Sequence, residues 1–159
     1  MKKLFYIIIF FIYSFFSYAD NNHQEKIDEL FNQLKNTTNY QESKKIESQI
    51  WELWTTHPSK SNLTALMADG SFYMSQNKLE TAYETFTQTI KLDPNWAEAW
   101  NKRATVLYLM GEYELSQADI NKVLELEKRH FGALSGQGLV QAALNNYQKA
   151  IDSYIEAHK

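Results

Sequence analysis

The sequence predicts an all-α protein in which a helical hairpin precedes a solenoid of helix–turn–helix repeats. Two observations support the all-α class. The 159 residues include only 5 Gly and 2 Pro, too few for an all-β fold with its many tight turns. Apolar residues also recur with the spacing of amphipathic helices. A third observation, a 34-residue period in the chain after residue 62, predicts the solenoid.

Residues 1–19 have the pattern of a secretory signal peptide. Two lysines precede an apolar and aromatic run, and the small residues Ser17 and Ala19 precede a candidate cleavage site. An uncleaved membrane anchor is the alternative, but the run over residues 4–19 is shorter than the roughly 20 apolar residues of a spanning helix. We therefore expect an exported protein with no membrane span after cleavage. The absence of Cys fits a bacterial periplasm, and a eukaryotic secretory route is the alternative.

Residues 20–62 are predicted to form the helical hairpin. Two apolar stripes with helical spacing run along this segment: Ile27, Leu30, Phe31 and Leu34, then Ile46, Ile50, Leu53 and Trp54. Polar turn formers at residues 36–39 separate the stripes. Pro58 ends the second helix, because its ring disfavours helix in the residue before it. Two helices joined by so short a turn pack as an antiparallel hairpin.

Three segments, 63–96, 97–130 and 131–159, align with one another without a gap. The alignment produces a column of small residues at Gly70, Ala104 and Gly138, and a column of large apolar residues at Phe86, Ile120 and Tyr154. The small column predicts the place where two helices of one unit cross closely. A third column, Asn77, Gly111 and Asn145, falls at the turn between those helices. Glycine and asparagine tolerate the left-handed backbone conformation that such turns require.

These segments resemble the tetratricopeptide repeat (TPR) family. The middle segment carries the family's pattern at Trp100, Ala104, Gly111, Tyr113, Ser116, Ile120 and Val123. It departs from the pattern at Lys128, where the family has proline, and the third segment is incomplete at its end. The resemblance implies a solenoid of helix pairs, and small exported bacterial TPR proteins look similar. It implies a protein-binding role and says little about chemistry.

No pattern in the chain indicates catalysis, a metal or a cofactor. The absence of Cys excludes thiolate metal sites and cysteine nucleophiles. The four histidines lie far apart without zinc-ligand spacing, so we expect them to be solvated or loop residues. The sequence contains no nucleotide-binding or nucleophile-elbow motif. The net charge of −3 lacks the basic excess of a nucleic-acid binder.

The predicted binding surface is the concave face of the solenoid, which the first helix of each repeat lines. Helical phase places eight residues on this face: Met67, Ser71, Met74, Asn101, Thr105, Tyr108, Ser135 and Leu139. Methionine, tyrosine and asparagine suit peptide contacts. The lysines and asparagines with which some TPR modules bind a C-terminal carboxylate are not in place here. Gly132 and Gly136 share a helix face, which we interpret as close packing of the preceding repeat's helix, with a ligand backbone as the alternative.

The sequence therefore predicts a non-catalytic exported protein that binds proteins or acts as a scaffold in the cell envelope. Its partner would be a peptide or a helix of another protein, held on the concave face. Two alternatives remain open. One is an envelope enzyme or an accessory subunit of such an enzyme. The other is an oligomeric structural element joined as a homo-oligomer through the third repeat.

Overall fold

The computed structural model describes residues 21–158, and every regular element in that range is a helix. The all-α prediction is confirmed. The signal-peptide prediction for residues 1–19 lies outside the described residues. Among the residues described, no helix is long and apolar enough to cross a membrane. The chain divides into two units, Met1–Ser61 and Asn62–Lys159.

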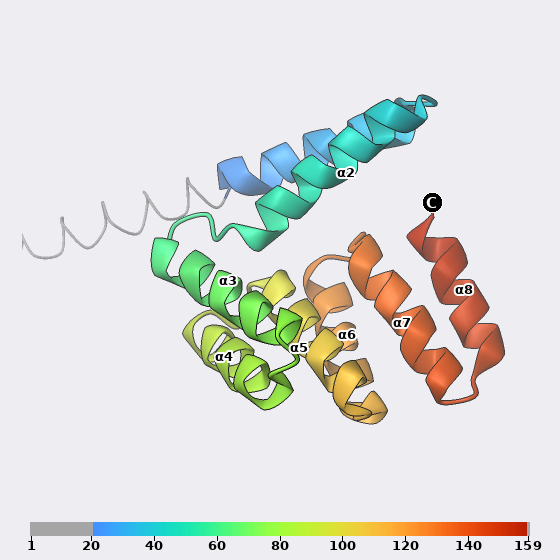
Figure 1. Ribbon diagram of the computed structural model, residues 1–159. Helices are drawn as coiled ribbons and strands as arrows, with labels where there is room; N and C mark the ends of the chain where they lie inside the picture. Colours follow the sequence, from blue (N-terminus) through green and yellow to red (C-terminus); the bar gives the residue numbers. More distant parts are fainter. Residues whose placement is uncertain (1–20, 159) are drawn as a thin grey trace, which may run out of the picture. The chain divides into compact units, whose positions relative to one another are not determined.

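The first unit contains a helical hairpin. A helix over residues 21–36 and helix α2 (Tyr40–Thr55) are joined by residues 37–39 (Figure 1). The side chain of Asn39 caps α2 by accepting the N–H groups of Gln41 and Glu42. The two helices pack through aromatic rings, with the ring centroids of Phe31 and Trp54 5.9 Å apart. The two predicted apolar stripes therefore face each other.

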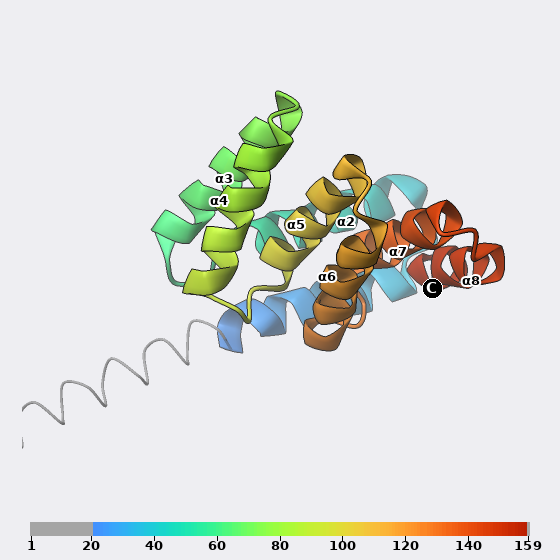
Figure 2. The ribbon, with the colours of Figure 1, turned by 90° about the horizontal axis from the view of Figure 1, so that it is seen from below.

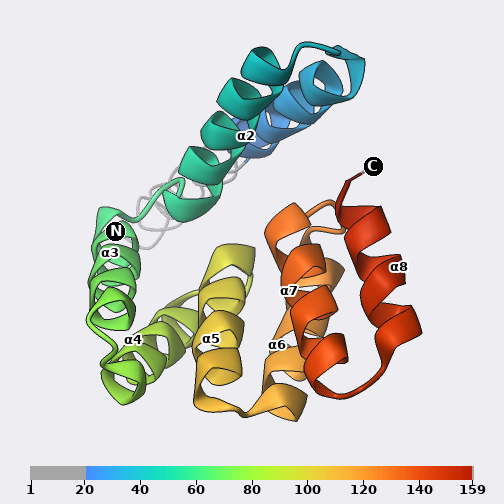
Figure 3. The ribbon, with the colours of Figure 1, turned by 45° about the vertical axis from the view of Figure 1, so that its right-hand side comes forward.

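The second unit contains three pairs of helices. The first pair is α3 (Ser61–Ser75) and α4 (Leu79–Leu92), and the second is α5 (Ala97–Met110) and α6 (Tyr113–Leu126). The third is α7 (Phe131–Ala143) and α8 (Tyr147–Ala157). Figures 2 and 3 show the helices of each pair side by side, and the pairs following one another in chain order.

The turns inside the three pairs have the predicted left-handed backbone. The φ angles are +56° at Asn77, +85° at Gly111 and +62° at Asn145. These three residues occupy the turn column of the sequence alignment. The amide N–H of Gly111 also donates to the carbonyl of Tyr108, which closes the end of α5.

The small and large columns of the alignment meet where the helices of each pair cross. A Cβ on Gly70 would lie 2.5 Å from the ring of Phe86, and a Cβ on Gly138 would lie 2.6 Å from the ring of Tyr154. In the second pair, Ala104 and the smaller Ile120 belong to one buried cluster. Each pair therefore matches the size of one residue to the other, which lets the helices approach closely.

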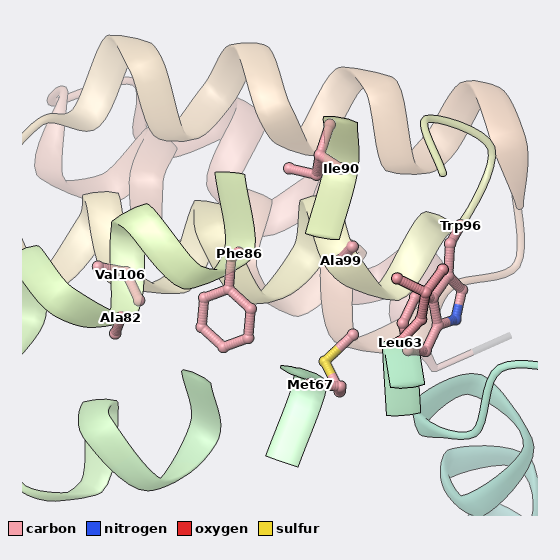
Figure 4. Close-up of a cluster of buried hydrophobic side chains, with 8 residues drawn as sticks. All are labelled: Leu63, Met67, Ala82, Phe86, Ile90, Trp96, Ala99 and Val106. Atoms are coloured by element: carbon pink, nitrogen blue, oxygen red, sulfur yellow. The ribbon is translucent and has the colours of Figure 1, made fainter. Parts of the chain in front are cut away.

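A buried apolar cluster joins the first pair to α5. Leu63 and Met67 of α3 and Phe86 of α4 pack with Val106 of α5 in this cluster, as Figure 4 shows. Trp100 packs against this cluster and also against the next one, and its indole N–H donates to the carbonyl oxygen of Pro94 at 2.9 Å. Neighbouring pairs thus share buried apolar contacts, as expected for repeats that stabilise each other by stacking.

A bidentate ion pair joins α5 to α6. The Nε and Nη2 atoms of Arg103 each lie 2.8 Å from a carboxylate oxygen of Asp119. The Nη1 atom also donates to Thr87 of α4, and the guanidinium lies 5.0 Å from the ring centroid of Trp100. The hydrogen bond to Asp119 raises the pKa of Arg103 above its ordinary value. Arg103 therefore stays charged and links three helices.

Candidate functional site

A small pocket of about 50 Å³ opens between α5, α6 and α7. Its wall is mostly apolar, and these residues form that part of it: Ala104, Tyr108, Ile120, Gly136, Leu139 and Val140. Three polar residues complete it: Asn101, Thr105 and Ser116. Four of the predicted binding residues, Asn101, Thr105, Tyr108 and Leu139, are therefore brought together in one pocket. The remaining lining residues were not predicted as site residues.

Two of the three hydroxyl groups that line the pocket, those of Thr105 and Ser116, already donate within the protein. The Thr105 hydroxyl donates to the carbonyl oxygen of Asn101 at 3.0 Å. The Ser116 hydroxyl donates to the carbonyl oxygen of Ala104 at 2.7 Å, from one helix of the pair to the other. Neither of these two hydroxyl protons is left for a ligand in this arrangement, so the Thr105 and Ser116 parts of the wall are less polar than their composition suggests.

A buried network fixes the orientation of the Asn101 side chain. The Ala133 N–H donates to Nδ1 of His130, so Nε2 of the neutral imidazole carries the proton. Nε2 lies 3.0 Å from Oε2 of Glu98, and the same oxygen accepts the Asn101 amide N–H at 2.9 Å. Lys102 lies 3.3 Å from the other carboxylate oxygen. Because the nitrogen of the Asn101 amide is engaged with a carboxylate, its oxygen is the atom left to accept a hydrogen bond at the pocket.

Two of the histidines, His57 and His130, have structural roles. They lie in loops, which is one of the two placements expected, but they are not solvated, since they are 7% and 0% exposed. Both lie in loops before helices, and Nδ1 of His57 accepts the backbone N–H groups of Ser59 and Lys60. No helical spacing could have revealed the His130 role, because its carboxylate partner is 32 residues away. In the described part of the chain, no group of three His, Asp or Glu residues could hold a metal ion.

The other predicted site residues are placed differently. The expectation that Met67 faces an open surface is wrong, since its side chain is 2% exposed and packs in the first buried cluster. Met74 is partly buried against the same cluster. Ser71 is half-buried and donates to the carbonyl oxygen of Met67. Ser135 is half-buried on α7. None of these four lines the pocket.

Packing in the folded protein does not require a glycine at residue 136. The nearest atom to a Cβ built there would be Cδ1 of Ile120 at 3.7 Å, an ordinary van der Waals contact. The expectation that Gly136 allows close packing of the preceding repeat's helix is therefore wrong. Gly138, two residues later, is the glycine that packing requires.

The first unit also contains a hollow, a shallow groove of about 530 Å³ along its hairpin. Side chains from both helices line it, with Leu30 and Leu53 among polar and charged residues of both signs, including Lys26, Glu29 and Glu52. Its mixed charge favours no particular ligand. The pocket between α5 and α7, which four predicted residues share, is therefore the stronger candidate.

Several known proteins are similar to this chain. The model of the tetratricopeptide repeat family matches residues 64–95 and 97–130. A TPR repeat-containing protein of Rhizobium etli is 34% identical over 137 residues, which cover 86% of this chain and 66% of that protein. The chain belongs to the tetratricopeptide repeat family. TPR segments of this kind serve as protein-interaction modules.

Two more similarities concern longer proteins. Hsp70-Hsp90 organizing protein 3 of Arabidopsis thaliana is 27% identical over 90 residues, which cover 57% of this chain and 16% of that protein. The TPR2AB domain of yeast Sti1, in a complex with pHSP90, has a similar fold with a TM-score of 0.59 and 18% identity. That alignment covers 86% of this chain and 55% of the other. This TPR chain thus spans two thirds or less of each of these proteins.

Proposed function

We propose that this TPR protein is a non-catalytic adaptor of the cell envelope, which binds a short peptide or a helix of a partner protein on the surface of α5 and α7. The observation that carries the proposal is the pocket between these helices, because four residues expected to contact a ligand line it together. Preformed, mostly apolar hollows with a few polar groups are usual ligand sites. The similar fold of the Sti1 domain in its complex with pHSP90 also supports a protein partner.

The envelope location rests on the sequence of residues 1–19. Two lysines, an apolar run and small residues before Asp20 are typical of a signal peptide that is removed on export. N-terminal sequencing of the protein recovered from cell fractions tests this part of the proposal. Export predicts a chain that begins at Asp20 in the envelope fraction, and a chain that begins at Met1 in the cytosol would contradict it.

The binding surface is tested with one substitution made at two places. Leu139 of α7 and Leu115 of α6 are 46% and 54% exposed, and only Leu139 lines the pocket. Leu139→Arg places a charged side chain across the pocket, so we expect partner capture to fall at least about tenfold. Leu115→Arg, the matched control, should leave capture unchanged. The measurement is a pull-down from envelope extract with each tagged full-length protein, quantified for every partner that the wild type retains.

The control variant also decides where the site lies. Equal capture by Leu139→Arg and wild type would move the site away from α7. Loss of capture in Leu115→Arg alone would place it on the surface of α6. Circular dichroism of both variants checks that each remains helical.

A second candidate function is a homo-oligomer formed through the third repeat. Helix α8 exposes an apolar stripe, with Tyr147, Ile151 and Ile155 63%, 52% and 56% exposed. An exposed stripe of this kind is a frequent contact surface between copies of a chain. Light scattering of the full chain tests it, because a monomer at high protein concentration would exclude this function.

A further inference from the structure

We propose that the pocket between α5, α6 and α7 receives one aliphatic side chain of the bound segment, of about valine to leucine size, and that Gly136 sets this size limit. The inference rests on the proposed binding function and specifies its ligand. It starts from a glycine that is unfavourable in a helix and that packing does not require.

Glycine inside a helix costs stability, so its presence at residue 136 needs a reason. Glycine is less favourable than alanine at such a position, because its backbone loses more conformational freedom in a helix. A Cβ at Gly136 would meet only Ile120, at 3.7 Å, so alanine would fit the folded protein. Gly136 is also a lining residue of the pocket. The missing methyl group therefore leaves space in the pocket, where a ligand could use it.

The size of the pocket limits what can enter it. A cavity needs roughly 10–15 Å³ to hold one water molecule. The volume of about 50 Å³ therefore admits about three or four non-hydrogen atoms. A valine, isoleucine or leucine side chain has this size. An aromatic ring, which is larger, would not enter without movement of α5 or α7.

The chemistry of the wall favours an aliphatic side chain over a charged one. Ala104, Ile120, Leu139 and Val140 supply apolar contact. The hydroxyl of Ser116 is engaged with a backbone carbonyl. No Lys or Arg lines the pocket to neutralise a carboxylate, and no Asp or Glu lines it to neutralise a cation. A charged side chain would therefore lose its hydration there without gaining a partner.

One hydrogen bond would hold the backbone beside that side chain. Glu98 accepts from the Asn101 amide nitrogen, which leaves the amide oxygen of Asn101 as an acceptor at the pocket. The backbone N–H of the ligand residue that carries the aliphatic side chain can donate to this oxygen. Glu98 and His130 act here as positioning residues, because they keep the Asn101 amide from turning over.

A phage-displayed library of random 12-residue peptides provides the test. Selection on the wild-type full-length chain should enrich valine, isoleucine or leucine at one peptide position. Gly136→Ala narrows the pocket, so we expect the enriched wild-type peptides to bind it about tenfold more weakly. The same variant should melt about 2–4 °C higher, because alanine stabilises the helix. A gain in stability together with a loss of binding is an outcome that damage to the fold cannot produce.

The control is Thr81→Ala, an exposed substitution in α4 that also raises helix propensity but lies outside the pocket. It should leave peptide binding unchanged. Enriched peptides with no aliphatic preference, or peptides that bind Gly136→Ala as tightly as wild type, would overturn this inference while leaving the proposed function standing. Enrichment of no peptide at all would overturn this inference and the binding of a short peptide, and it would leave a partner helix as the ligand of the proposed function.

Discussion

In the second and third helix pairs, the two helices of a pair are joined at equivalent positions by different polar contacts. In the second pair, Arg103 and Asp119 form a bidentate ion pair with two distances of 2.8 Å. The residues 34 positions later are Gln137 and Ser153, where the Ser153 hydroxyl donates to the Gln137 amide oxygen at 3.0 Å. The backbone arrangement is therefore compatible with a charged or a neutral contact. What the repeat requires is the close helix crossing, and the polar contact beside it varies.

The first and third pairs differ in another way, although both combine glycine with an aromatic ring. The Phe86 ring opposite Gly70 is 0% exposed, whereas Tyr154 opposite Gly138 is 37% exposed. A buried ring has no space into which it can move, but a partly exposed ring can turn toward solvent. Replacing the glycine with a larger residue should therefore cost more stability in the first repeat than in the third.

The largest effect on the free energy of unfolding is expected when the ion pair between Arg103 and Asp119 is removed. Arg103→Ala leaves the Asp119 carboxylate, whose side chain is 7% exposed, without its partner. We expect this to lower the free energy of unfolding by about 3 kcal/mol, since an unpaired buried charge is costly. Urea unfolding followed by circular dichroism measures the change.

Two further variants sharpen the comparison at this contact. The double variant Arg103→Gln with Asp119→Ser copies the third pair into the second, and it should recover more than half of the lost stability. Lys122→Ala removes the exposed ion pair with Glu125 and should cost less than about 0.5 kcal/mol. A loss below about 1 kcal/mol for Arg103→Ala would show that the ion pair contributes little, and that the two pairs are equivalent.

The second largest effect on the free energy of unfolding is expected at the two glycine–aromatic contacts, and it should differ between them. Gly70→Ala forces a methyl group against the buried ring of Phe86, so we expect a loss of about 2 kcal/mol. Gly138→Ala makes the same contact with Tyr154, which can turn outward, and should cost less than about 1 kcal/mol. Thermal and urea unfolding of both variants test the difference.

A compensating change tests the cause of the loss. Combining Gly70→Ala with Phe86→Ile copies the Ala104–Ile120 combination of the second pair into the first. The double variant should be more stable than Gly70→Ala alone. Equal losses for Gly70→Ala and Gly138→Ala would contradict the argument that exposure of the ring decides the cost.

Local patterns predicted the repeat geometry well, because the geometry depends on residue size and backbone preference at fixed intervals. Gly70 and Gly138 lie at crossings, and Asn77 and Asn145 have left-handed backbones, as the columns required. Half of the predicted site residues line one pocket for the same reason, since helical phase fixes which side chains share a face.

The remaining features depend on contacts that no local pattern contains. Met67 is buried because α3 and α4 pack their apolar sides on α5, which phase within one helix does not reveal. The bond between His130 and Glu98 spans 32 residues, and the Arg103–Asp119 pair spans 16. In the sequence, the small column explains Gly138, whereas Gly136 was interpreted together with Gly132 as a place of close packing. Only the position of Ile120 shows that a methyl group would fit there.

The smallest effect is expected at the neutral contact of the third pair. Gln137→Ala removes the acceptor of the Ser153 hydroxyl, but that hydroxyl also donates to the carbonyl oxygen of Lys149 at 2.8 Å. No hydrogen-bonding group is therefore left without a partner, and the free energy of unfolding should fall by about 0.5 kcal/mol or less. The measurement is urea unfolding under the conditions used for Arg103→Ala. A loss as large as that of Arg103→Ala would mean that the two contacts are equally important, and that charge has no special role in joining α5 to α6.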